Sequence, residues 1–113
     1  MMKDWSGQRV LIIGAARQGT ALARYLAFHG AQVVINDQRS ADDLQDVQDS
    51  MSDLPIQWVV GQHPLSLLNK IDLICPSGGV PLTLPMIIEA QKRGIPLSND
   101  SQVFLESAPC KVI

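Results

Sequence analysis

Residues 10–37, VLIIGAARQGTALARYLAFHGAQVVIND, constrain the fold more than any other part of the sequence. An apolar, β-branched run at 10–13 stops at Gly14, and a helical pattern follows it. A second β-branched run at 33–35 then leads to Asp37. A strand, a helix and a second strand in this order are typical of the first βαβ unit of a doubly wound α/β domain, which holds its ligand at the carboxyl ends of the strands.

The loop between the first strand and the helix is a degraded form of the G-x-G-x-x-G fingerprint. Gly14 and Gly19 occupy the first and third glycine positions, whereas Ala16 replaces the second. The middle glycine lets a pyrophosphate approach the backbone, so its loss favours a related nucleotide held differently over an ordinary dinucleotide. The N–H groups that open the helix could bind a phosphate, with contacts from Arg17 and Gln18. A tight turn that only packs the helix against the strand remains the alternative.

Asp37 ends the second strand, 23 residues after Gly14. An ionised carboxylate at this place can accept hydrogen bonds from a ribose diol or from a base N–H. Arg39 could stack on a base or pair with a phosphate. Without the glycine loop Asp37 would be interpreted as a solvated strand end; together with that loop, it favours a ligand-binding role.

Strands and helices alternate along the rest of the chain, which favours a Rossmann-like, three-layer α/β domain with a mainly parallel five-stranded sheet. The first helix carries Ala21, Leu22, Tyr25, Leu26 and Phe28 on its predicted apolar face, and Gly30 is expected to end it. Ser77, Gly78 and Gly79 follow the fourth strand and could complete a phosphate-binding crevice, or form a tight turn. The predicted strands are 9–14, 32–36, 56–60, 71–75 and 95–98, and the predicted helices 17–29, 41–51, 64–69, 84–93 and 101–107.

Composition and motifs argue against several classes of function. The net charge of -2 gives no electrostatic case for a nucleic-acid partner or an anionic membrane, and no apolar run is long enough to span a bilayer. Cys75 and Cys110 lack metal-ligand spacing, so a reduced, cytoplasmic protein without a metal site is expected. The sequence has no Walker A lysine and no serine-nucleophile elbow, so no catalytic residue is assigned.

Four segments together resemble the N-terminal domain of the Mur ligases, most closely the branch that adds D-glutamate. They are VLIIGAARQGTALARYL, VINDQR, SGGVPLTLPMIIEAQKRGIPL and NDSQVFLE, and their order and spacing agree with the family over nearly the whole chain. The chain departs from the family at Ser77-Gly78-Gly79, where Ser-Pro-Gly is common, and near Asn99 and Gln102.

The resemblance implies that this domain binds the UDP moiety of UDP-N-acetylmuramoyl-L-alanine in peptidoglycan biosynthesis. Residues 1–108 would form the UDP-binding domain, and 109–113 a connector that begins a truncated central ATPase domain. ATP, magnesium and D-glutamate would bind in domains outside this chain, so the chain alone is expected to have no cofactor and no ligase activity. The implied UDP-binding residues are Gly14, Ala16, Arg17, Gln18, Gly19, Asp37, Gln38, Arg39, Ser77, Gly78 and Gly79.

Two other functions remain open at this point. One is a regulatory or redox Rossmann module that binds NAD(H); Asp37 is compatible with it, whereas Ala16 in place of the middle glycine counts against it. The other is a nucleotide-free α/β scaffold for protein contacts. A Walker A motif encoded directly after Ile113 would favour the ligase.

Overall fold

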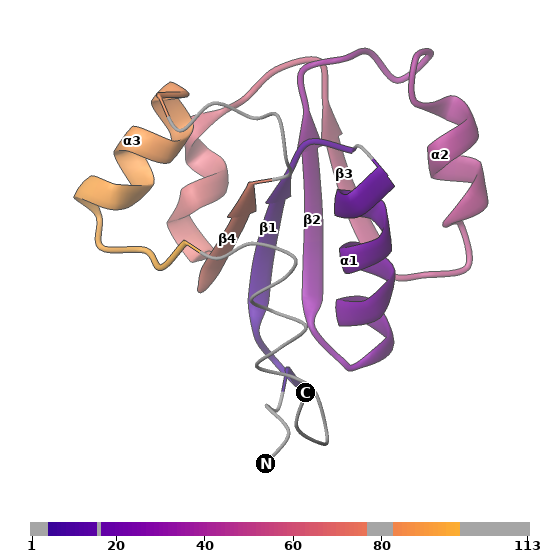
Figure 1. The fold of residues 1–113 in the computed structure, drawn as a ribbon, viewed down its shortest axis with the longest axis horizontal. Coiled ribbons are helices and arrows are strands. Elements are labelled where there is room, and N and C mark those ends of the chain that lie inside the picture. The colour runs from indigo at the N-terminus through magenta and orange to yellow at the C-terminus, as the bar shows by residue number, and fades with distance from the viewer. Residues whose placement is uncertain (1–4, 16, 77–82, 98–113) are drawn as a thin grey trace, which may run out of the picture.

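The structure is a computed structural model that describes residues 5–15, 17–76 and 83–97. Parallel strands form one sheet, with helices on both of its faces (Figure 1). The elements in chain order are β1 (Arg9–Ile13), α1 (Arg17–Phe28), β2 (Gln32–Asp37), α2 (Gln45–Ser50), β3 (Ile56–Val60), the 3-10 helix η1 (Leu65–Lys70), β4 (Leu73–Pro76) and α3 (Pro85–Lys92).

The described strands lie in the order β3-β2-β1-β4, and each neighbouring pair is parallel. This confirms the predicted Rossmann-like α/β fold. The prediction of a five-stranded sheet is wrong for the described residues, because the fifth strand is reduced there to one parallel bridge between Ile74 and Leu97. Pro96 accepts a hydrogen bond from the Ile74 N–H at 3.0 Å but has no N–H to donate, which limits the ladder.

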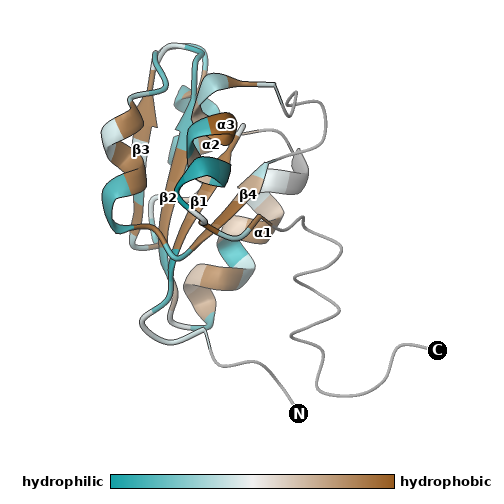
Figure 2. Cartoon of the chain, turned by 90° about the vertical axis from the view of Figure 1, so that its left-hand side faces the viewer, coloured by the Kyte–Doolittle hydropathy of each residue, from teal (hydrophilic) through white to brown (hydrophobic). Residues whose placement is uncertain are grey.

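Alternating residues of β1 build two hydrophobic layers. Val10 and Ile12 face α1, whereas Leu11 and Ile13 face α3, and all four side chains are buried. A central parallel strand that is covered on both faces is apolar throughout, as the brown strands in Figure 2 illustrate. The sheet is therefore a rigid support for the loops at its edges. The helices and adjoining turns contribute Leu22, Ala23, Leu26, Leu44 and Met51 to the first layer, and Leu68, Met86, Ile87 and Ala90 to the second.

Helix α1 packs through Leu22, Ala23 and Leu26, and the prediction that Ala21 and Phe28 join this face is wrong, because both are exposed. Phe28 is 80% exposed, because it lies two residues beyond Leu26 and so on the far side of a 3.6-residue turn. The predicted stop at Gly30 is confirmed. Gly30 has φ +90°, its N–H donates to the Ala27 carbonyl, and the Ala31 N–H donates to the Leu26 carbonyl, which is a Schellman end.

Helix α2 is shorter than the predicted span 41–51. Turns occupy residues 41–44, where Ser40 Oγ accepts a hydrogen bond from the Asp43 N–H at 3.3 Å. Strand β4 begins at Leu73 and not at residue 71, because Asp72 caps β1. Its carboxylate accepts the Arg9 N–H at 2.9 Å, and its own N–H donates to the Arg9 carbonyl at 2.8 Å.

Candidate nucleotide-binding edge

The candidate site lies where the parallel strands end, at the carboxyl edge of the sheet. The chain runs from β1 to β2 to β3 in one direction and then returns to place β4 on the other side of β1. Helix α1, which follows β1, and helix α3, which follows β4, pack on opposite faces of the sheet, and such a switch point is where open α/β sheets hold ligands. Of the predicted site loops, those after β1 and β2 start at this edge, whereas residues 77–79, after β4, lie outside the described residues.

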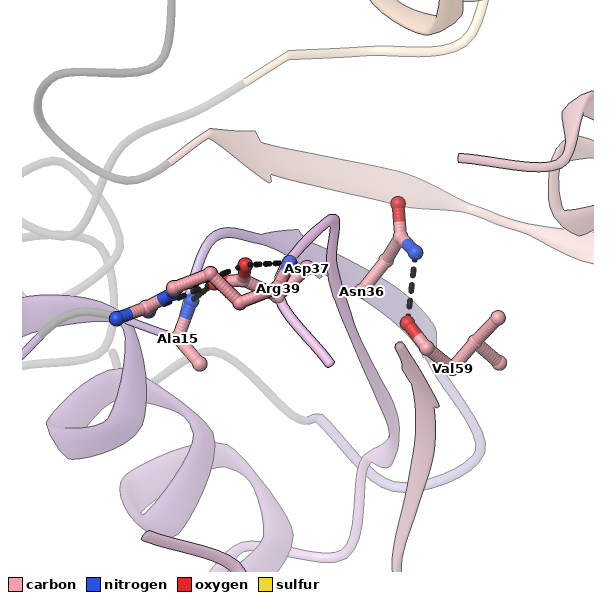
Figure 3. A network of polar contacts seen from close by, with 5 residues as sticks. All are labelled: Ala15, Asn36, Asp37, Arg39 and Val59. Carbon is pink, nitrogen blue, oxygen red and sulfur yellow. Dashed lines mark hydrogen bonds and ion pairs between the residues drawn. The ribbon is translucent and has the colours of Figure 1, made fainter. Parts of the chain in front are cut away.

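Asp37, the last residue of β2, connects the loop after β1 to the loop after β2 (Figure 3). Its Oδ2 accepts a hydrogen bond from the Ala15 N–H at 2.8 Å. Arg39 folds back over the same carboxylate, with Nη2 2.8 Å from Oδ2 and Nε 3.1 Å from Oδ1. The Arg39 N–H also donates to Oδ1 at 2.8 Å. The carboxylate is thus a structural acceptor as well as a candidate ligand contact.

The Asp37 side chain is only 7% exposed, whereas that of Arg39 is 50% exposed. Burial would raise the pKa of the Asp37 carboxyl, but its hydrogen bonds from Arg39 and from the Ala15 N–H, with the Arg39 charge, lower that pKa from 3.8 to about 2. Asp37 is therefore a carboxylate at neutral pH, and it holds the half-exposed guanidinium of Arg39 at the edge of the sheet.

This pKa makes the stability of the domain depend on pH. Because the folded-state pKa lies below the ordinary value, the carboxylate stabilises the fold above about pH 4 and loses this contribution as the pH falls through about 2. The contribution amounts to at most about 2 kcal/mol. We expect the free energy of unfolding, measured by urea denaturation, to fall between about pH 6 and about pH 2.5 in wild type. In Asp37→Asn it is expected to fall less. Equal losses in both proteins would contradict the low pKa.

Gly14 and the start of α1 form the other side of the edge. Gly14 has φ +98°, and its N–H donates to the Asn36 carbonyl at 2.7 Å, so the chain turns sharply out of β1. Helix α1 begins three residues later, and its first turn contains no acidic residue. The positive end of the helix dipole is therefore not neutralised within that turn, which suits an anionic ligand.

The other predicted site residues have different placements. Arg17 and Gln18 are the first two residues of α1, and Gly19 is buried in that turn. Gln38 is exposed in the bend after β2, beside Arg39. Ala16, Ser77, Gly78 and Gly79 lie outside the described residues. The structure thus brings Gly14, Gly19, Asp37, Gln38 and Arg39 to one edge.

Sequence reasoning missed the loop after β3. Asn36 is fully buried, and its Nδ2 donates to the carbonyls of Val59 and Gln62 at 2.7 Å each. The Gly61 N–H donates to the carbonyls of both Asp37 and Arg39 at 2.9 Å. A polar residue inside the apolar run of β2 was the available signal for Asn36, because a buried amide needs partners.

A groove of about 710 Å³ lies at the opposite, amino edge of the sheet. Arg9 and Gln32, the first residues of β1 and β2, line it together with Leu67 and Lys70 of η1. We do not assign the nucleotide to this groove, because no helix of the first βαβ unit begins there. Helix α1 ends beside it, and a helix carboxyl end repels anions.

The described residues contain neither a membrane-spanning helix nor a cluster of metal ligands. No helix in that part of the chain is long and apolar enough to cross a membrane. No three His, Cys, Asp or Glu side chains gather there in a way that could hold a metal ion.

The strand order and the strand-end loops define a Rossmann-like α/β domain with a topological switch point at the carboxyl edge of its sheet. Its fold is similar to that of shikimate dehydrogenase from Aquifex aeolicus, with a TM-score of 0.62 at 15% identity over 97% of this chain and 52% of that one. The family described as "Mur ligase MurD-like, N-terminal domain" matches residues 8–99, and this chain belongs to that family.

Curated relatives agree with this assignment. UDP-N-acetylmuramoylalanine--D-glutamate ligase of Alkaliphilus metalliredigens is 33% identical over 97% of this chain and 25% of its own length. The enzyme of the same name from Shouchella clausii is 42% identical over 90% of this chain and 22% of its own. Among solved structures, a pseudomurein peptide ligase type C from Methanothermus fervidus has a TM-score of 0.68 at 26% identity, over 88% of this chain and 20% of that one. The chain spans about a quarter of the length of these relatives.

Proposed function

We propose that this domain binds the UDP moiety of UDP-N-acetylmuramoyl-L-alanine for a ligase that adds D-glutamate. The carboxylate of Asp37 carries the proposal, because it ties the Ala15 N–H and the Arg39 side chain together at the switch-point edge. A nucleoside diphosphate offers both a polar base and an anionic diphosphate. The base fits the loop that contains Asp37, Gln38 and Arg39, and the diphosphate fits the start of α1.

The names of the relatives support the choice of substrate. They are called ligases of UDP-N-acetylmuramoylalanine and D-glutamate, and they match this chain over most of its length. Ala16 stands where a dinucleotide fingerprint has its second glycine, which favours a nucleotide sugar over NAD(H). We therefore infer a substrate-binding role and not a redox role for the same edge.

We assign the chemistry of amide formation to other domains of such a ligase. The chain offers no Walker A lysine for ATP. We propose that ATP, magnesium and D-glutamate bind outside residues 1–113, and that this chain alone binds the nucleotide without turnover.

The experiment that tests the proposal is an amide-resolved NMR titration of the chain with UDP, with NADH in a parallel titration. We expect UDP to shift the amide signals of residues 14–19, 37–39 and 77–79 and to leave those of the amino edge, such as Gln32 and Lys70, in place. Shifts with NADH alone would overturn the proposal in favour of a redox module. Shifts with neither nucleotide would remove nucleotide binding from this chain.

A further inference from the structure

Asn36 lies next to Asp37 in β2, but its side chain points to the opposite face of the sheet, toward β3 (Figure 3). It is fully buried, and its Nδ2 donates to the Val59 carbonyl in β3 and to the Gln62 carbonyl in the loop after β3. Both amide hydrogens are therefore used on the neighbouring strand and its loop. A buried amide with these partners fixes the path of that loop.

His63 completes this cluster. Because both acceptors of the Asn36 Nδ2 are carbonyl oxygens, the orientation of the amide is determined, and Oδ1 is the atom that contacts His63 Nδ1. Oδ1 can only accept a hydrogen bond, so Nδ1 must carry the proton. The neutral imidazole of His63 is thus held in the Nδ1–H tautomer.

The loop that Asn36 holds is bonded to the candidate site. The Gly61 N–H donates to the carbonyls of Asp37 and Arg39, at 2.9 Å each. Asn36 also accepts the Gly14 N–H through its own backbone carbonyl. Asn36 therefore bonds to the loop after β1 and to the loop after β3, and Gly61 links the loop after β3 to Arg39 in the loop after β2.

We propose that Asn36, together with His63, is a positioning residue for the nucleotide-binding edge. Asn36 fixes the loop at residues 61–63. In that loop the Gly61 N–H bonds to the carbonyls of Asp37 and Arg39, on either side of Gln38, and so holds the backbone in the conformation in which the Arg39 side chain pairs with Asp37. This inference rests on the proposed function for its effect on UDP affinity. Its effect on the backbone at 37–39 is independent of any ligand.

The test compares Asn36→Ala, His63→Ala and the control His29→Ala. His29 follows the end of α1 at the amino edge and contacts the rings of Tyr25 and Phe28, so its removal leaves the candidate site intact. Amide hydrogen exchange is measured without ligand at Gly61 and Arg39, with Leu11 and Ile12 of β1 as reporters of global unfolding. The affinity for UDP and the 15N signals of the imidazole are measured on the same samples.

We expect Asn36→Ala to speed exchange at Gly61 and Arg39 about tenfold more than at the β1 amides, and to weaken UDP binding about tenfold. His63→Ala has smaller effects in the same direction, and His29→Ala has none. The His63 signals of the wild type indicate the Nδ1–H tautomer, and Asn36→Ala abolishes that preference. If Asn36→Ala does not fold, His63→Ala and the tautomer of the wild type decide the question.

Wild-type exchange at Gly61 and Arg39 in a folded Asn36→Ala protein would overturn the inference. So would unchanged UDP affinity in that variant when the wild type binds UDP. If the wild type fails to bind UDP but the exchange and tautomer results are as expected, the proposed function fails and the positioning of residues 37–39 stands. The two proposals are thus tested separately.

Discussion

Replacing Asp37 with alanine is expected to weaken UDP binding by more than about tenfold and to lower the free energy of unfolding by about 2–3 kcal/mol. The variant leaves the Ala15 N–H without its acceptor and releases Arg39, whose guanidinium then loses its fixed place at the edge. A buried donor that loses a charged acceptor accounts for the loss of stability. Isothermal titration with UDP and urea denaturation measure the two effects.

Two further variants separate the loss of the hydrogen bond to Ala15 from the loss of the ion pair with Arg39, and both from the loss of a carboxylate elsewhere. Asp37→Asn keeps an oxygen for the Ala15 N–H but loses the ion pair with Arg39, so we expect part of the stability and little of the affinity to be retained. Glu89→Ala is the matched control, because it removes the carboxylate of a partly exposed pair between Glu89 of α3 and Arg93 just after that helix, with the N and O atoms 2.9 Å apart. That pair is expected to contribute less than about 1 kcal/mol and nothing to UDP binding. Wild-type UDP affinity in Asp37→Ala would remove Asp37 from the site.

Replacing Gly14 with alanine is expected to lower the free energy of unfolding by about 1–3 kcal/mol and to weaken UDP binding about tenfold. Gly14 has φ +98°, a backbone conformation that a residue with a Cβ rarely adopts. Relief of this strain would move the Gly14 N–H from the Asn36 carbonyl and displace the start of α1. Chemical denaturation and a UDP titration of the same variant test both consequences.

Gly7→Ala is the matched control for this prediction. Gly7 has φ +78°, and a Cβ there would meet no atom within 4 Å, so the variant carries a similar backbone strain without a clash. Gly7 lies before β1, away from the carboxyl edge, and its N–H donates to the Gly30 carbonyl. We expect Gly7→Ala to lose stability and to keep its UDP affinity. Equal loss of affinity in both variants would mean that Gly14 acts only through global stability.

The local elements were predictable because their signals are local. The β-branched runs of β1 and β2 and the glycine end of α1 depend on neighbouring residues, and the structure agrees with them. The wrong predictions had different causes: Phe28 was placed on the packed face against the helical period, whereas the start of β4 depended on the distant contact between Asp72 and Arg9. The span 41–51 begins with turns, and the fifth strand contains one bridge among the described residues, where Pro96 limits the ladder.

The candidate site was predictable in position but not in its bonding. Asp37 ends a strand in a βαβ unit, so its place at the carboxyl edge follows from the order of the elements. Its hydrogen bond to the Ala15 N–H joins residues 22 positions apart and required the paired strands. Asn36 was missed because its partners, Val59 and Gln62, lie on another strand and its loop.

The sequence by itself determined the α/β class, the parallel βαβ order and the edge of the sheet at which the candidate site residues lie. These follow from hydrophobic periodicity and from glycine positions, which act over a few residues. Only the tertiary structure decided that Asp37 is a buried carboxylate paired with Arg39, and that Asn36 bonds to the loops after β1 and β3. Burial and hydrogen-bond partners arise when distant segments pack together, so their energies depend on neighbours that a linear pattern does not specify.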